Sequence, residues 1–123
     1  MDYRIRRNTA DSIALAARNI YPDEFIAMLG GEKKKRLIDE LVVVPAIYGE
    51  DFAAIKQYLL PFDFRILGSV HSHPSNSSLP SIGDLSTFLA LGEIHIIIAH
   101  PFNLNTMKAF NSKGKEIKLE VVD

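Results

Sequence analysis

Two histidines and one aspartate stand at a spacing that could bind a single metal ion. His71 and His73 are two residues apart, so in an extended strand both imidazoles project from the same face. Asp84 follows after ten intervening residues, which is enough for a loop to turn back and begin a helix. The first turn of that helix would aim a carboxylate at the imidazoles. The three side chains form a candidate metal site with two nitrogen ligands and one oxygen ligand.

The number of ligands indicates a catalytic site. Structural zinc is usually held by four protein ligands, whereas catalytic zinc keeps three and leaves a position for water. Bound Zn²⁺ lowers the pKa of water from about 15.7 to roughly 7, and a nearby carboxylate can accept the proton as hydroxide attacks a carbonyl. The chain has no cysteine, which excludes zinc sites with Cys ligands, including those of nucleobase deaminases. The pattern therefore predicts a zinc hydrolase that needs one further acid.

The complete motif resembles that of the JAMM or MPN+ metallopeptidases. Their motif is a distant Glu, then His-x-His-Pro, six residues and Ser-x-x-Asp. This sequence reads His71-Ser72-His73-Pro74, six residues, and Ser81-Ile82-Gly83-Asp84, so every position and gap is filled. The family's Glu opens a strand of small and apolar residues, as Glu24 does here before the Gly30-Gly31 pair. The chain is similar to the short stand-alone archaeal-type members, which are deubiquitinase-like or desampylase-like.

This resemblance implies a role for each matched residue. The zinc ligands would be His71, His73 and Asp84, with one Zn²⁺ per chain and water as the fourth ligand. Glu24 would accept the proton of this water and pass it to the leaving amine. By position its neighbour Asp23 is a rival, and the family pattern selects Glu24.

Other polar residues near the motif have alternative explanations. Ser81 would stabilise the tetrahedral oxyanion together with the metal, but it could equally cap a helix, and both roles require that its hydroxyl be shared or reorient. Ser72 and Pro74 match the motif without a direct chemical role. His95 and His100 flank an apolar strand and match no motif ligand, so we expect an outward or satisfied core histidine and a strand exit.

The resemblance also implies a substrate. It is the amide or isopeptide bond after the C-terminal glycine of a ubiquitin-like modifier, including small archaeal (SAMP-type) modifiers and their conjugates. An extended tail of this kind could bind by adding to a sheet edge. Two alternatives remain open: the same chemistry on a sulfur-carrier-protein–amino-acid adduct or another peptide, and a non-catalytic MPN scaffold. The full set of site residues argues against the scaffold.

Length and composition indicate one domain over residues 1–123. Hydrophobic residues make up 47% and charged residues 24%, which excludes a disordered or fibrous protein. The formal net charge of −1 provides no positive field for nucleic acid or an anionic membrane. No stretch approaches the roughly 20 apolar residues of a membrane span. We therefore expect a cytoplasmic protein, either a monomer or a homodimer formed through an exposed strand edge.

Two segments show the patterns of helices. Apolar residues recur at helical spacing over residues 8–20, with Asn8 or Thr9 as the candidate cap. Ser81 is placed to cap a second helix over residues 82 to about 91.

Strands are indicated by runs of apolar and β-branched residues. We expect the basic run 33–36 to be a solvated turn between two of these strands, and residues 75–80 to form a loop. The pattern of residues 52–58 fits a strand or a helix, and we prefer the strand. The expected strands cover 25–29, 41–44, 64–71, 94–99, and a terminal hairpin of 107–110 with 117–122. The order of elements predicts an α/β fold in which helices pack on a mixed, curved β-sheet, with active groups where strand ends meet the second helix. The resemblance implies the MPN/JAMM fold, with its cytidine-deaminase-like architecture.

Overall fold

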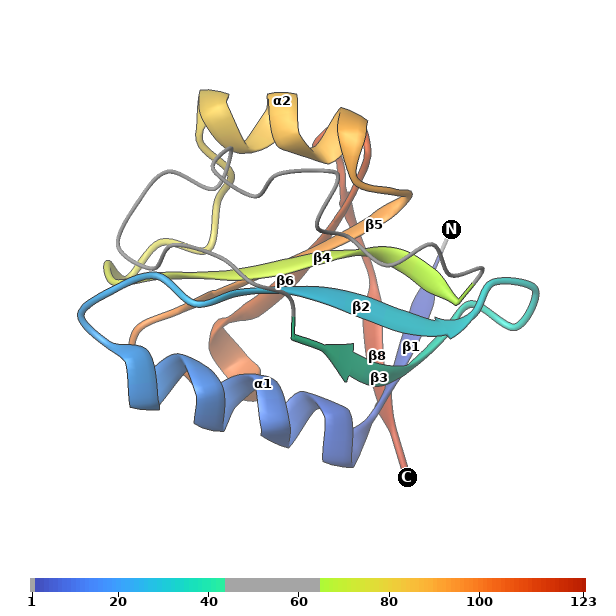
Figure 1. Ribbon diagram of the computed structural model, residues 1–123, viewed down its shortest axis with the longest axis horizontal. Helices are drawn as coiled ribbons and strands as arrows, with labels where there is room; N and C mark the ends of the chain where they lie inside the picture. Colours follow the sequence, from blue (N-terminus) through green and yellow to red (C-terminus); the bar gives the residue numbers. More distant parts are fainter. Residues whose placement is uncertain (1, 44–64) are drawn as a thin grey trace.

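The computed structural model describes residues 2–43 and 65–123. Its elements, drawn in Figure 1, are β1 (Tyr3–Arg6), α1 (Arg7–Ile20), β2 (Ile26–Glu32), β3 (Leu37–Val42), β4 (Ile66–His73), α2 (Ile82–Ala90), β5 (Ile94–Ala99), the 3₁₀ turn η3 (Leu104–Thr106), β6 (Met107–Asn111), β7 (Glu116–Ile117) and β8 (Leu119–Val122). Among these described residues, no helix is long and apolar enough to cross a membrane.

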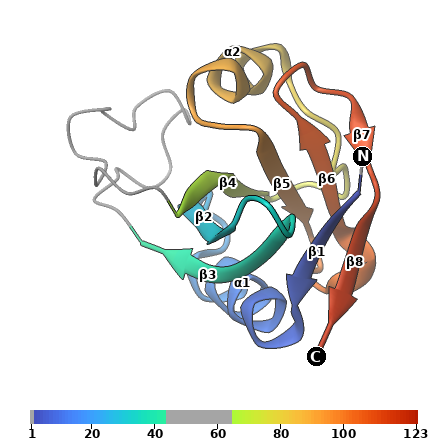
Figure 2. The same cartoon turned by 90° about the vertical axis from the view of Figure 1, so that its right-hand side faces the viewer.

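The strands form one mixed sheet in the order β7-β6-β5-β4-β2-β3-β1-β8. Strand β4 lies at its centre, antiparallel to β2 and parallel to β5. Strands β7 and β8 follow one another along the chain yet stand at opposite ends of this order, so the sheet curls toward a closed barrel (Figure 2). The predicted fold class, a mixed curved sheet packed by helices, is confirmed.

The two helices cover opposite faces of the sheet (Figure 1). The face under α1 carries the large apolar core, in which Ile13 and Ala17 of the helix meet Val70, Ile96 and other strand residues. The face under α2 holds a smaller apolar cluster of Phe88, Ile97 and Phe110. Strand residues alternate between these faces, so from Gly68 onward the even-numbered residues of β4 face α1 and the odd-numbered residues face α2. A register shift before Gly68 reverses the order, and Leu67 packs in the large core while Ile66 packs beside Leu91.

The predicted helices are both present, but one predicted cap is wrong. Helix α1 begins at Arg7 directly after β1, and its N-cap residue Arg6 makes no side-chain capping hydrogen bond. Asn8 and Thr9 therefore lie inside the first turn and cannot cap it. Helix α2 is capped by Ser81 as predicted.

The strand predictions were correct in position and less accurate in extent. Strand β2 continues through the glycine pair, β3 begins four residues before the predicted 41–44 run, and residues 33–36 form the turn between them. Strand β1 was not predicted. The terminal hairpin is only partly correct, because β7 pairs with β6 while β8 leaves to pair in parallel with β1. The segment 52–58 lies outside the described residues.

Candidate metal centre

The two histidines lie near the C-terminal end of β4, on the face of the sheet that α2 covers. The register of β4 with β2 sets Ile26 opposite His71, and a backbone hydrogen bond from Ser72 N–H to the Phe25 carbonyl, 2.9 Å, continues this pairing. His71 and His73 project from the same face, as their spacing predicted. The side chain of His71 is 1% exposed and that of His73 is 15% exposed. One ligand is thus buried and the other lies at the mouth of the site.

The three predicted metal ligands converge on one point. The Nε2 atoms of His71 and His73 are 3.1 Å apart. Asp84 places Oδ1 3.1 Å from Nε2 of His71 and Oδ2 3.2 Å from Nε2 of His73. Zinc at about 2.0–2.2 Å from tetrahedral nitrogen and oxygen ligands would separate them by roughly 3.3–3.5 Å. Each of the three observed separations is within a few tenths of an ångström of that spacing, with the two carboxylate oxygens of Asp84 each facing one histidine.

The hydrogen bonds around His73 also fit a metal. Its Nδ1 lies 3.0 Å from the carbonyl oxygen of Ser77. A carbonyl only accepts, so Nδ1 carries a proton. Nε2 donates to Asp84 in the metal-free protein, and it would present a lone pair to a metal that displaces that proton. Metal-binding histidines are commonly oriented by such a bond from the second ring nitrogen. The donor set of two imidazoles and one carboxylate is one that zinc accepts.

Asp84 is held in place by the start of α2. The Ser81 hydroxyl accepts a hydrogen bond from the Asp84 backbone N–H, 3.1 Å, and Asp84 Oδ2 accepts one from the Ser81 backbone N–H, 2.8 Å. This reciprocal pair is a capping box in which aspartate takes the place of the usual glutamate. The cap that begins the helix therefore also orients the carboxylate ligand.

The electrostatics of the site follow from the same contacts. Burial opposes ionisation of Asp84, but hydrogen bonds from His71 and His73 hold the pKa of this carboxyl well below its ordinary value. Burial lowers the pKa of His73, but its hydrogen bond with Asp84, the Ser77 carbonyl and the charges of Asp84 and Glu24 together raise it above its ordinary value. A negative carboxylate beside two imidazoles is the charge state that suits a cation.

Glu24 lies on the same side of the sheet as the histidines. Since Phe25 is bonded to Ser72, continuing the antiparallel register by one more pair would set Glu24 opposite His73, on the face of both histidines. Its charge acts on His73 across this short separation. The residue is half-buried, whereas Asp23 is exposed one position earlier. Of these two acids, Glu24 is therefore the less exposed one, and its charge raises the pKa of a predicted metal ligand.

Ser72 has a role that the sequence did not show. Its side chain is buried, and its hydroxyl accepts the backbone N–H of Phe25 at 2.7 Å. Together with the backbone bond between the same two residues, this contact ties the strand of the histidines to the residue after Glu24. The only hint in the sequence was the place of a hydroxyl residue between the two histidines.

The two remaining histidines lie apart from the metal ligands. His95 is fully buried on β5, with both ring nitrogens in hydrogen bonds, so it is a satisfied core histidine as predicted. His100 follows β5 at the strand exit and packs beside Tyr21 and Phe102.

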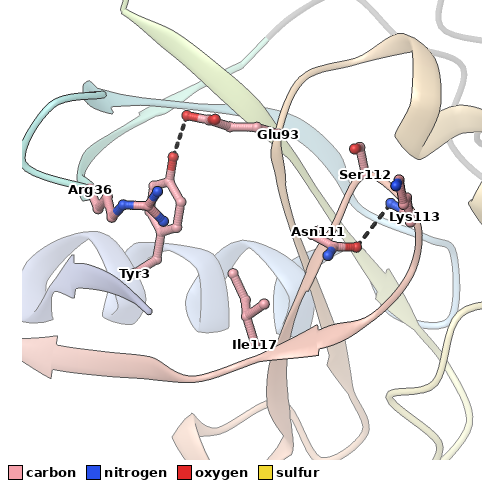
Figure 3. Close-up of a pocket in the computed structure, with 7 residues that line it drawn as sticks. All are labelled: Tyr3, Arg36, Glu93, Asn111, Ser112, Lys113 and Ile117. Atoms are coloured by element: carbon pink, nitrogen blue, oxygen red, sulfur yellow. Dashed lines mark hydrogen bonds between the residues drawn. The ribbon is translucent and has the colours of Figure 1, made fainter. Parts of the chain in front are cut away.

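A cavity of about 320 Å³ lies away from the metal ligands. Figure 3 shows Tyr3 donating a hydrogen bond to Glu93 beside Arg36, with Lys113 across the opening. Burial and the neighbouring Glu93 raise the pKa of Tyr3. None of the predicted site residues lines this cavity, although Arg36 belongs to the basic run of the sequence.

Comparison with known sequences finds similar proteins over nearly the whole chain. The model of a family described as prokaryotic homologs of the JAB domain matches residues 6–113. A probable metalloprotease from Haloferax volcanii is 30% identical over 128 residues, which cover 97% of this chain and 79% of the relative.

Solved structures are similar as well. A JAB1/MPN domain protein from Archaeoglobus fulgidus is 41% identical with a TM-score of 0.79, over 98% of this chain and 99% of that one. A structure described as JAMM, a metalloprotease-like zinc site in the proteasome and signalosome, is 39% identical with a TM-score of 0.78, and each chain is covered in full. A protein from Desulfitobacterium hafniense, 18% identical with a TM-score of 0.67 over 100% of this chain and 94% of that one, supports the fold alone.

Proposed function

Since this chain belongs to the JAB/MPN family of metalloprotease-like domains, we propose that it hydrolyses the peptide or isopeptide bond after the C-terminal glycine of a ubiquitin-like, SAMP-type modifier. The chain is a JAMM-type metallopeptidase, and His71, His73 and Asp84 form its site for one zinc ion. The convergence of three ligand atoms within 4.8 Å of one another, with Glu24 on the same face, carries the proposal.

Zinc in this site supplies a Lewis acid that activates water and polarises the scissile carbonyl. The protein's own groups do the rest. Glu24, opposite His73, is placed to accept a proton from the attacking water and to deliver it to the leaving amine. Because Asp84 is buried and bonded to both imidazoles, it stays ionised and is not available as the base.

Ser81 can serve as both cap and oxyanion donor. As the cap its oxygen accepts the Asp84 N–H, which occupies a lone pair and leaves the hydroxyl proton to be donated. The residue is exposed at the mouth of the site, where a substrate carbonyl would arrive. The two roles that the sequence left in competition are thus compatible without reorientation.

The substrate class rests on family resemblance together with the site chemistry. A modifier tail ending in glycine is extended and narrow, so it suits a site at the end of a sheet. Hydrolysis of a sulfur-carrier-protein–amino-acid adduct or another peptide would use the same groups, so it is the alternative substrate class. A scaffold without catalysis is the weaker alternative, because the set of Glu24, Ser81 and the three ligands is complete. A cytoplasmic location, and an assembly that is either a monomer or a homodimer, stay predictions.

The test compares cleavage of three substrates with the same modifier: a conjugate to a lysine side chain, a linear peptide fusion and an adduct of one amino acid. Zinc content is measured in parallel. Glu24→Gln should retain about one zinc per chain and lose turnover by roughly 10²–10⁴-fold, the usual contribution of general acid–base catalysis. Asp23→Asn is the matched control, since it removes the neighbouring carboxylate, and should leave both quantities unchanged.

The outcomes separate the alternatives. Cleavage of the lysine conjugate by the wild type and not by Glu24→Gln supports the proposal. Preference for the amino-acid adduct would move the assignment to that substrate. Zinc binding without cleavage of any of the three substrates would favour the scaffold. Loss of turnover in Asp23→Asn and not in Glu24→Gln would identify Asp23 as the base in place of Glu24.

A further inference from the structure

His95 is a buried histidine that neither binds the metal nor lies at the surface. Its side chain is 0% exposed, on the strand β5 that lies beside β4. Nε2 lies 3.0 Å from the Gly92 carbonyl oxygen, and Nδ1 lies 2.6 Å from the hydroxyl of Ser69. The ring stacks on Phe88 of α2 with centroids 4.3 Å apart and planes 6° from parallel. One side chain thus joins the sheet to the helix and to the turn after it.

These contacts fix the ring in a single state. The Gly92 carbonyl only accepts, so Nε2 carries the proton and Nδ1 accepts the hydroxyl proton of Ser69. Burial lowers the pKa of His95 to about 4, so the ring is neutral at neutral pH. Both nitrogens are satisfied in this neutral form.

Helix α2 is anchored to the sheet along one face. Asp84, Thr87 and Phe88 are buried, whereas Ile82 is 87% and Leu89 is 72% exposed. Asp84 and Phe88 are four residues apart and therefore lie one turn apart on the same side of the helix. The position of the Phe88 ring consequently determines where the turn that carries Asp84 lies.

Phe88 stands between His95 and the metal ligands. Its ring centroid is 4.3 Å from that of His95 and 6.4 Å from that of His71. His95 thus holds α2 at two points, at Phe88 by stacking and at Gly92 by the hydrogen bond beyond the end of the helix. The carboxylate of Asp84 is at the other end of this short, rigid element.

We propose that His95 is a positioning residue of the zinc site: through Phe88 and Gly92 it sets the place of α2, and with it the distance of the Asp84 carboxylate from His71 and His73. The inference rests on the zinc site of the proposed function and is independent of the substrate. Residues that orient metal ligands without touching the metal typically change affinity by 10–100-fold. A role of this kind is visible in zinc affinity before any peptide is cleaved.

The test measures zinc affinity by competition with a chromogenic chelator. His95→Phe keeps an aromatic ring for stacking and loses both hydrogen bonds, whereas His95→Gln retains a donor near the Nε2 position and loses the ring. Each should weaken zinc binding by about tenfold or more. Asp84→Ala alone and combined with each His95 variant completes a double-mutant cycle, with the double variants measured at raised zinc concentration.

The cycle distinguishes positioning from general stability. If His95 acts through Asp84, its substitution should leave zinc affinity unchanged in the Asp84→Ala background. Weakened binding of equal size in both backgrounds would overturn the proposal, as would a lowered melting temperature with unchanged zinc affinity in the parent background. Circular dichroism of the zinc-free variants confirms folding. Ser69→Ala, which removes only the donor to Nδ1, serves if the His95 variants do not fold, and unchanged affinity there would then count against the proposal.

These readouts stay separate from the proposed function. An absence of peptidase activity on every substrate would remove the proposed reaction and leave the zinc measurements intact. Loss of coupling in the cycle would remove the role of His95 and leave the reaction intact.

Discussion

The two faces of the sheet bury different kinds of side chain. Under α1 the buried side chains form one continuous cluster whose residues run along the sequence from Tyr3 to Ala109. Under α2 the buried set includes the polar side chains Ser69, His71 and His95, with only a small apolar cluster beside them. Both faces belong to the same strands, so the alternation of residues in β4 and β5 separates them.

This difference teaches where stability and chemistry reside. Apolar burial provides most of the free energy of folding and tolerates no unpaired polar group. A metal site needs polar groups held in fixed directions, which only satisfied hydrogen bonds can provide. We therefore expect truncations under α1 to change stability alone, and changes under α2 to alter the metal site as well.

The largest expected effect on stability tests this separation directly. Ile13 of α1 is 0% exposed in the large cluster, so Ile13→Ala should lower the free energy of unfolding by about 2–5 kcal/mol. The matched truncation is Ile97→Ala, since Ile97 is equally buried, packs with Phe88 and pairs with His71 across β4 and β5. Both variants are measured by denaturant unfolding of the zinc-free protein and by zinc competition.

The two truncations should differ in zinc binding. Ile13→Ala should leave the affinity of the folded protein unchanged, so saturating zinc should add the same stability as in the wild type. Ile97→Ala should weaken binding, because the cavity would lie beside a ligand. Equal zinc affinities in the two variants would show that the faces are not independent in the way we describe.

A smaller effect, on the pH dependence of stability, comes from His95. Burial and the nearby His71 lower the pKa of His95, whereas hydrogen bonds to the Gly92 and Phe88 carbonyls raise it. Together these effects place the pKa at about 4, below the ordinary value of 6.5. Below pH 6.5 the His95 side chain binds a proton in the unfolded chain but stays neutral in the folded chain. Protonation therefore stabilises the unfolded chain, and stability falls as the pH is lowered toward 4. The full difference corresponds to about 3 kcal/mol. Above pH 6.5 the residue contributes no pH dependence.

This effect is tested by comparing zinc-free wild type with zinc-free His95→Phe. The two proteins share every other titrating group, so the difference between their profiles of unfolding free energy against pH isolates His95. The wild type should lose stability more steeply between pH 6.5 and 4, measured by urea unfolding at several pH values. Parallel profiles would mean that the buried ring is protonated in the folded state as readily as in the unfolded chain.

The residues of the metal centre could be predicted because their spacing is local. His71 and His73 need only an extended strand to share a face, and Asp84 needs only the helix that Ser81 caps. Strand β5 could be predicted because its run of isoleucines, interrupted only by His95, is typical of a strand that is buried on both faces.

The missed elements depend on partners far away in the sequence. Strand β1 is four residues long and owes its pairing to β3 and β8, so no local signal separated it from the helix that follows. The continuation of β2 through Gly31 depends on β3, because a Cβ there would collide with the Leu37 carbonyl. Gly31, which suggested an end to the strand, is instead required by the close approach of the neighbouring backbone.

The part of the site that the sequence explained least gives the smallest predicted effect. Ser72 lies on the α1 side of β4, yet its hydroxyl accepts the Phe25 N–H next to Glu24. Ser72→Ala should leave this buried amide without its side-chain acceptor, at a cost of about 1–3 kcal/mol in unfolding free energy. Ser72→Thr, which keeps the hydroxyl, should restore most of that loss.

The same pair of variants tests whether one face can influence the other. If Ser72 positions the residue that precedes Phe25, Ser72→Ala should lower kcat on the modifier conjugate while zinc content stays at about one per chain, because no ligand is removed. Ser72→Thr should recover both kcat and stability. A loss of stability without a change in kcat would restrict Ser72 to folding, and the chemistry would then belong wholly to the face under α2.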